Sequence, residues 1–112
     1  QVADGAGIRR HKISAATTTV STTPFSALTT HDVLLVNASG GAITVNLPAA
    51  ASAGNGKLLT VKKTDSSVNA VTVDGSGGET IDGSLTLLLS LQFQSRTVVS
   101  DGSNWHVVSA HL

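Results

Sequence analysis

Apolar and polar residues alternate along several short segments of this chain, the pattern of β-strands that bury one face. The clearest segment is residues 84–93, where every second residue from position 85 onward is apolar. Residues 42–47 and 69–74 show the same alternation. We therefore expect these three rows to form the core, closed by the one tryptophan. The predicted core consists of Ile43, Val45, Leu47, Val71, Val73, Leu85, Leu87, Leu89, Leu91, Phe93 and Trp105.

Three residues do not fit a simple inside–outside pattern, and they are candidates for a subunit interface. Leu88 lies on the otherwise polar side of its strand, which indicates a second contact surface such as a neighbouring subunit. Arg96 lies mid-strand among apolar and β-branched residues, where it pairs with an acid across an interface, binds an acidic ligand or faces solvent. His106 either meets its counterparts on a three-fold axis or is an exposed, hydrogen-bonded ring.

Turn residues separate the predicted strands at short intervals. Three Asp-Gly pairs mark turns, because Asp bonds the backbone locally and Gly accepts positive φ: Asp74-Gly75, Asp82-Gly83 and Asp101-Gly102. Asp-Gly between β-rich segments predicts a hairpin joining residues 95–100 and 104–110. A second hairpin is predicted between residues 32–37 and 42–47. With a strand at 57–63, about eight short strands predict an all-β fold, a small antiparallel β-sandwich or barrel.

The N-terminal part of the chain has a different character. Residues 1–10 are rich in Gly and Ala without periodicity, whereas residues 12–22 are β-branched with weak alternation. We expect residues 1–22 to be an extended N-terminal arm or linker, with 12–22 as an alternative first strand. Residues 23–112 are then the β-sandwich module.

Composition excludes several classes of function. Only 12% of the residues are charged and the net charge is zero, so the chain lacks the basic surface of a nucleic-acid binder. So sparse a charge is instead typical of a subunit that assembles, because charge keeps soluble proteins apart. There is no Cys, and no apolar run approaches the ~18 residues of a membrane-spanning helix, so we expect no membrane insertion.

Candidate chemistry is sparse, and we predict no enzyme, cofactor, catalytic residue or metal site. Asp74, Glu79 and Asp82 supply the carboxylates that Ca²⁺ prefers, but Asp at a turn more often bonds the backbone. Four His lie scattered, and no G-x-S-x-G motif accompanies them. Trp105 either stacks on a sugar or caps the core, and we favour the core.

Residues 44–84 read "TVNLPAAASAGNGKLLTVKKTDSSVNAVTVDGSGGETIDGS" and residues 100–108 read "SDGSNWHVV". These two stretches resemble a β module of tailed-bacteriophage virion proteins, such as tail fibres and tail needles. The resemblance extends over residues 33–108. Arg96 and His106 depart from it, since an apolar residue and an aromatic one are expected at these positions.

The resemblance implies a knob-like homotrimer on a virion, assembled in the host cytoplasm, without enzymatic activity. Its expected partners are its own copies, other virion proteins and a host surface glycan or protein. The leading hypothesis is thus a module of a tail fibre, needle or spike for virion architecture and host attachment. The alternative is a capsid decoration protein that stabilises the phage head, and a third is a carbohydrate-binding module.

Overall fold

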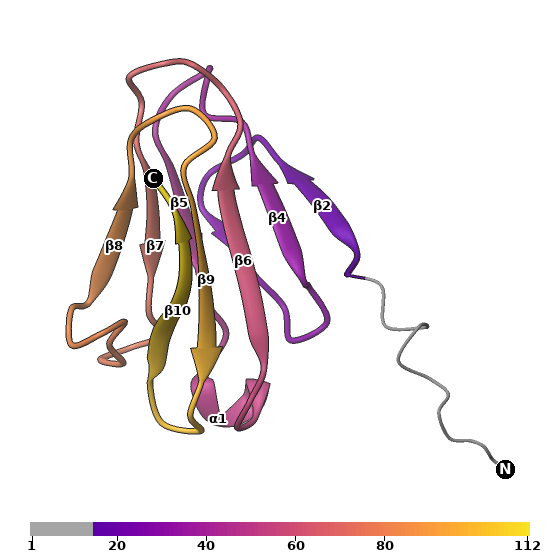
Figure 1. Cartoon of the computed structure of the whole chain (residues 1–112), viewed down its shortest axis with the longest axis vertical. Helices are drawn as coiled ribbons and strands as arrows, with labels where there is room; N and C mark the ends of the chain where they lie inside the picture. The colour runs from indigo at the N-terminus through magenta and orange to yellow at the C-terminus, as the bar shows by residue number, and fades with distance from the viewer. Residues whose placement is uncertain (1–14) are drawn as a thin grey trace, which may run out of the picture.

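The first six strands of the described part alternate between two sheets, and the last three complete both sheets (Figure 1). The computed structural model describes residues 15–112. One sheet has the strand order β10-β9-β6-β4-β2 and the other the order β3-β5-β7-β8. The strands are β2 (Thr17–Val20), β3 (Phe25–Ser26), β4 (Val33–Val36), β5 (Ile43–Asn46), β6 (Leu58–Lys63), β7 (Val71–Asp74), β8 (Thr86–Leu89), β9 (Ser95–Ser100) and β10 (Trp105–His111).

The first six of these strands stack in parallel. In one sheet β2 pairs with β4 and β4 with β6, and in the other β3 pairs with β5 and β5 with β7. Each turn of the chain therefore adds one strand to each sheet, like a turn of a coil. β2 falls within the predicted segment 12–22, whereas residues 1–14 of the predicted arm lie outside the described part.

The last three strands add antiparallel pairs, so both sheets are mixed. β8 pairs with β7, β9 with β6, and β10 with β9. The hairpin predicted across Asp101-Gly102 is confirmed: the Asp101 carboxylate accepts two turn N–H groups, and Gly102 has a φ of 91°. The all-β class is correct. The expectation of antiparallel pairing is confirmed only for these last three strands, and the two sheets do not close into the barrel that was the alternative to a sandwich.

The hairpin predicted between residues 32–37 and 42–47 is also wrong. These segments form β4 and β5, which lie in different sheets and pair with strands from other turns of the coil. The Gly-rich turn between them moves the chain from one sheet to the other, rather than reversing it within one sheet.

A single hydrophobic core joins the two sheets. Every second side chain points inward, and Trp105 has none of its surface exposed. The core consists of Val20, Ala27, Leu34, Val36, Ala38, Ile43, Val45, Leu47, Ala50, Leu59, Val61, Val71, Val73, Ile81, Leu89, Val98 and Trp105, with Leu87 partly buried against it.

Three predicted core residues are at the surface instead. Leu85, Leu91 and Phe93 expose 58%, 61% and 48% of their area. The alternation at 84–93 predicts one long strand, but β8 ends at Leu89. The Gln94 side chain accepts the N–H groups of the two residues after β8, at 2.8 and 3.1 Å, and so turns the chain away from the strand direction.

One helical turn, α1 (Ala50–Ala53), connects β5 with β6. The Glu79 carboxylate accepts its first N–H at 2.9 Å, and the buried Ser100 hydroxyl donates to the Ala50 carbonyl at 2.8 Å. Nowhere in residues 15–112 is there a helix with the length and apolar character to cross a membrane.

Candidate interaction surface

The most distinctive surface feature is the outer edge of β8, the last strand of the four-stranded sheet. One side of β8 bonds to β7, and no backbone hydrogen bond reaches its other side within the described part of the chain. Leu88 lies on the outer face beside Thr72 and is 59% exposed. Exposed sheet edges are normally protected by charges, Pro or a covering segment. β8 has neither charge nor Pro, so its edge is open to another strand.

Most of the exposed large apolar side chains come from β8 and from the part of the chain that follows it. Of the nine large apolar residues that are exposed in the described part, six follow residue 84. Single exposed apolar residues are ordinary on protein surfaces, but four of these six lie in or directly beside β8 and the loop that follows it, which makes this edge the main candidate for a contact. The six are Leu85, Leu88, Leu91, Phe93, Val108 and Leu112.

Part of the neighbouring edge, that of β10, is covered by the β7–β8 connection. The backbone N–H of Trp105 donates to the Thr80 carbonyl at 2.9 Å, and the backbone carbonyl of Trp105 accepts from the Asp82 N–H at 3.1 Å. The Asp82 carboxylate then accepts the Val107 N–H at 3.0 Å. These bonds join the two sheets and cover the first half of β10, while β8 is left uncovered.

His106 lies between two carboxylates, close to the bonds that join β10 to the β7–β8 connection. His106 Nε2 is 2.7 Å from Asp101 Oδ2, and His106 Nδ1 is 3.8 Å from Asp82 Oδ1. Bonds from the Asn104 N–H, the His106 ring and the Ser103 N–H lower the pKa of Asp101 to about 2. The arrangement ties the β9–β10 turn to the β7–β8 connection.

The carboxylates considered for calcium do not converge. Glu79 caps α1 and Asp82 accepts the Val107 N–H, whereas Asp74 lies on the outer face in register with Thr86. Across residues 15–112 no group of three or more His or acidic side chains is placed to hold a metal ion. Asp82 and Asp101 act locally at turns, as residues of that type commonly do.

The three predicted interface residues occupy different places. Leu88 is in the four-stranded sheet, whereas Arg96 and His106 are in the five-stranded one. Arg96 is half-buried, and its guanidinium donates to the carbonyls of Ser95 and His111. Of the three, only Leu88 is an exposed apolar side chain, and its place in an interface stays a prediction. Trp105 is fully buried, so its ring offers no face to a sugar.

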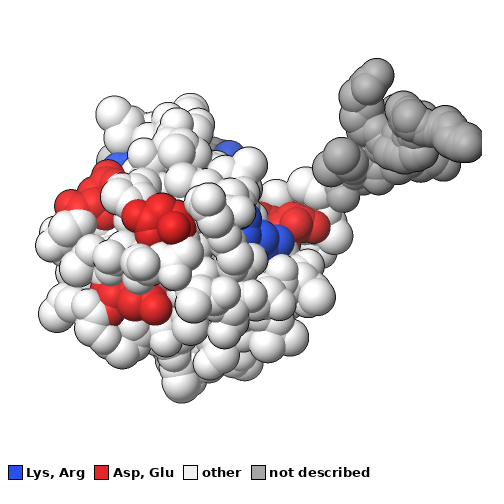
Figure 2. All heavy atoms as spheres, turned by 90° about the horizontal axis from the view of Figure 1, so that it is seen from below, with Lys and Arg blue, Asp and Glu red and all other residues white. Residues whose placement is uncertain are grey.

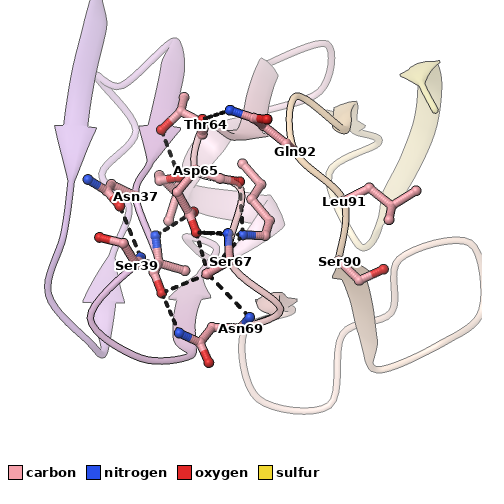
Figure 3. A network of polar contacts seen from close by, with 12 residues as sticks. Asn37, Ser39, Thr64, Asp65, Ser67, Asn69, Ser90, Leu91 and Gln92 are labelled. Carbon is pink, nitrogen blue, oxygen red and sulfur yellow. Dashed lines mark hydrogen bonds and ion pairs between the residues drawn. The ribbon is translucent and has the colours of Figure 1, made fainter.

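Sequence reasoning missed a buried ion pair at the end of β6. Lys63 has none of its surface exposed, and its Nζ is 2.8 Å from Asp65 Oδ2. Ser67 also donates to the Asp65 carboxylate, and Asn69 bonds the Ala38 carbonyl at 2.8 Å (Figure 3). Burial opposes the charge of Asp65, but bonds from Lys63, Ser67 and Ala38 hold its pKa well below its usual range.

A sequence signal for this pair was present. Lys63 follows Leu59 and Val61 at intervals of two, so it shares their inward face. A lysine on that face requires a carboxylate partner nearby, and Asp65 is two residues away. The network fixes the loop after β6 to the turn after β4.

Charge is unevenly distributed on the molecule. Seen from the end that carries α1, acidic side chains are more prominent than basic ones (Figure 2). Residues 15–112 contain six carboxylates and four Lys or Arg, whereas residues 1–14 contain three Lys or Arg and one Asp. The described part is thus acidic and the preceding segment basic.

Comparison of the chain with protein-family models and with curated proteins gives no match.

Proposed function

We propose that this chain is a non-enzymatic structural module of a bacteriophage virion, a self-associating sandwich-like knob of a tail fibre, needle or spike. Its role is virion architecture and attachment to a host surface glycan or protein, as a homotrimer. The observation that carries the proposal is the open apolar edge of β8 in a chain with few charges. An assembly that covers this edge keeps the module soluble, because it removes apolar surface from water.

The stretches that resemble phage virion proteins support a structural role. Within them, Lys63 pairs with Asp65, Glu79 caps α1, and Ile81 forms a bridge with Trp105. Each of these contacts joins segments that are distant in the sequence or fixes a loop. The resemblance thus rests on residues that build the module.

Light scattering on the purified chain tests the proposal. We expect a particle of three chains of 11.3 kDa for the wild type, and a smaller particle for Leu88→Lys, because a charge at the open edge prevents its burial. Val68→Lys is the matched control, since Val68 is 92% exposed in the β6–β7 loop and its variant should assemble as the wild type does.

A monomer at every concentration contradicts self-association. It would favour the alternative, a capsid decoration protein, for which binding to empty phage shells is the direct assay. Assembly unaffected by Leu88→Lys would place the interface elsewhere on the molecule.

A further inference from the structure

We propose that the outer edge of β8 pairs in parallel with the last part of β10, residues 108–112, of a second copy of this chain. This inference rests on the self-association proposed above and names the strand that covers the edge. Strand addition to an exposed edge gains affinity from backbone hydrogen bonds and specificity from alternate side chains. Both edges belong to the described part of the chain, and each has backbone groups that bond to no other element there.

The direction of the backbone groups in β8 follows from its pairing with β7. The Gly75 N–H donates to the Leu85 carbonyl at 3.2 Å, so Leu85 bonds toward β7. Bonding residues alternate in an antiparallel pair. The N–H and C=O groups of Thr86 and Leu88 therefore point away from β7, to the free edge.

Bonds within the chain limit this free edge at both ends. Ser84 would extend it, but the N–H and the carbonyl of Ser84 are both bonded to Ile81. Beyond β8, the Ser90 N–H donates to the Gln94 side chain at 2.8 Å. A partner strand therefore has the backbone groups of two residues of β8 to bind.

The last part of β10 has free backbone groups as well. On β9, Thr97 and Ser95 bond toward β10, because the residues that alternate with them bond toward β6. Thr97 and Ser95 are in register with Ser109 and His111. Ala110 lies between these two, so its N–H and C=O groups point away from β9. Across residues 15–112, no backbone bond from another element reaches them.

The two edges lie at one end of the fold, yet they are too far apart to pair within one copy. Ile81 bonds to Ser84 just before β8 and bridges to Trp105 at the start of β10, so this connection closes the first half of the end. Further along, β8 and β10 belong to different sheets. Packed sheets are about 10 Å apart, twice the spacing of bonded strands. A strand from a second copy is therefore needed to fill either edge.

The directions of the two strands suit a rotational assembly. β8 and β10 run toward the same end of the molecule (Figure 1). A three-fold axis along the strands leaves these directions unchanged, so that β8 of one copy meets β10 of the next in parallel. Each copy then uses both of its free edges, and the third contact closes the ring.

One parallel register joins the free backbone groups. In a parallel pair, a residue bonds to the two neighbours of the residue opposite it. With Leu88 opposite His111 of the partner subunit, the Leu88 N–H donates to the carbonyl of the partner's Ala110. The Leu88 carbonyl accepts the N–H of the partner's Leu112, and the Thr86 carbonyl accepts the N–H of the partner's Ala110.

The side chains that this register covers are mainly apolar. Leu112 exposes 81% of its area and Leu88 59%. The partner's Leu112 lies beside Leu89, and Leu88 lies beside the ring of the partner's His111. Residues 85–91 and 107–112 contain no Lys, Arg, Asp or Glu. The contact therefore removes apolar surface from water without burying any of these charges.

Disulfide trapping tests the register, because the chain has no Cys of its own. Leu88→Cys and His111→Cys are combined in the full chain, which is oxidised and run on a non-reducing gel. Opposite residues of paired strands are about 4.8 Å apart, within the range that a disulfide spans. We expect covalent dimers and trimers. A disulfide within one chain, or none in an assembled sample, overturns the inference.

Two controls accompany this experiment. Leu28→Cys with His111→Cys should remain largely uncrosslinked, because Leu28 is as exposed as Leu88 but follows β3, the opposite edge of the four-stranded sheet. Leu88→Cys alone should also give no covalent dimer. A dimer from this single variant would mean that β8 pairs with another β8, and it contradicts the inference.

A second measurement separates this inference from the proposed function. Ala110→Pro removes the N–H that donates to the Thr86 carbonyl of the partner subunit. It removes no bond to β9, because this N–H points to the free edge, where Pro is tolerated. We expect the dissociation constant of the assembly to rise about tenfold or more, since a buried carbonyl loses its donor. Ala110→Ser keeps the N–H and should assemble as the wild type does.

Light scattering over a dilution series compares these variants. If the wild type assembles and Ala110→Pro assembles equally well, the inference fails and the proposed function stands. If the wild type is a monomer, both fail. Far-UV circular dichroism checks that Ala110→Pro is folded, and the disulfide experiment decides if it is not.

Discussion

Lys63 and Asp65 form the one ion pair of residues 15–112 in which both side chains are almost fully buried. Several hydrogen bonds surround it, so the cost of removing two charges from water is largely offset. The pair also joins loops from two turns of the coil. Its role is therefore to specify how neighbouring turns align.

Removing one partner of this pair should be strongly destabilising. Asp65→Ala leaves the Lys63 ammonium buried without a counter-charge, and we expect a loss of about 3–5 kcal/mol in the free energy of unfolding, measured by urea titration. Asp32→Ala breaks the more exposed pair with Lys57, and we expect a clearly smaller loss, because solvent screens an exposed pair. Equal losses in the two variants would contradict the role of burial.

Asp101 gives a prediction for acid stability. Its pKa is about 2 in the folded protein and 3.8 without these contacts. A lowered pKa means that the stabilisation is complete above pH 3.8 and is lost as the pH falls toward 2. Asp101→Asn keeps an acceptor for the turn N–H groups and removes the charge. Thermal unfolding should show a smaller drop between pH 4 and pH 2 for this variant, whereas parallel pH profiles would contradict the prediction.

At the scale of elements, the β7–β8 connection depends on a close approach of two backbone segments. Gly75 lies against the carbonyl group of Glu79, so that a Cβ at position 75 would clash with it. The same connection caps α1 through the Glu79 side chain and bridges to β10 through Ile81. A shift of this connection therefore disturbs contacts with both sheets.

Gly75→Ala tests this close packing. We expect a loss of about 1–3 kcal/mol in the free energy of unfolding, the usual cost of overfilling a packed site. Gly78→Ala is the matched control, because a Cβ there meets nothing within 4 Å. Chemical denaturation of both variants measures the difference. Comparable losses would mean that the clash is relieved by a small movement of the loop.

The sequence predicts the elements better than their pairing. Alternation locates β5 and β7, since each side chain's face depends on its own strand, and Asp101-Gly102 predicts the β9–β10 hairpin, since that contact is local. Parallel pairing joins residues such as Val33 and Thr60, and no adjacent residues encode it. Leu91 and Phe93 fit the alternation but lie beyond the strand, because a side chain of the loop, Gln94, accepts the backbone N–H groups there.

For the candidate interface, too, the sequence predicts local features better than contacts between distant segments. Leu88 is identified from the sequence because it breaks a local pattern. Arg96 and His106 break the pattern too, but their partners come from other elements: the His111 carbonyl for Arg96, and Asp82 and Asp101 for His106. A break in the alternation thus identifies an unusual residue. It does not say whether the partner of that residue lies in the same chain or in another molecule.

At the scale of the whole molecule, the coil has two ends with different edges. β2 and β3 are the edge strands at one end, and β8 and β10 at the other. The first pair is joined to its neighbours in parallel and the second in antiparallel fashion. Two unlike ends allow head-to-tail contacts between copies, which form a ring only where the rotation from copy to copy closes.

The parallel coil also governs how the chain reaches its native state. β6 bonds to β4 on one side and to β9 on the other, so both of its partners are distant in sequence, and Trp105 closes the core from β10. Long loops must close before such contacts form, which gives a high contact order and slow folding. During synthesis, a chain that has reached β7 still lacks β9 and Trp105. The apolar side chains that face the core stay exposed to water until β10 has left the ribosome. Until then, they offer chaperones a surface to bind.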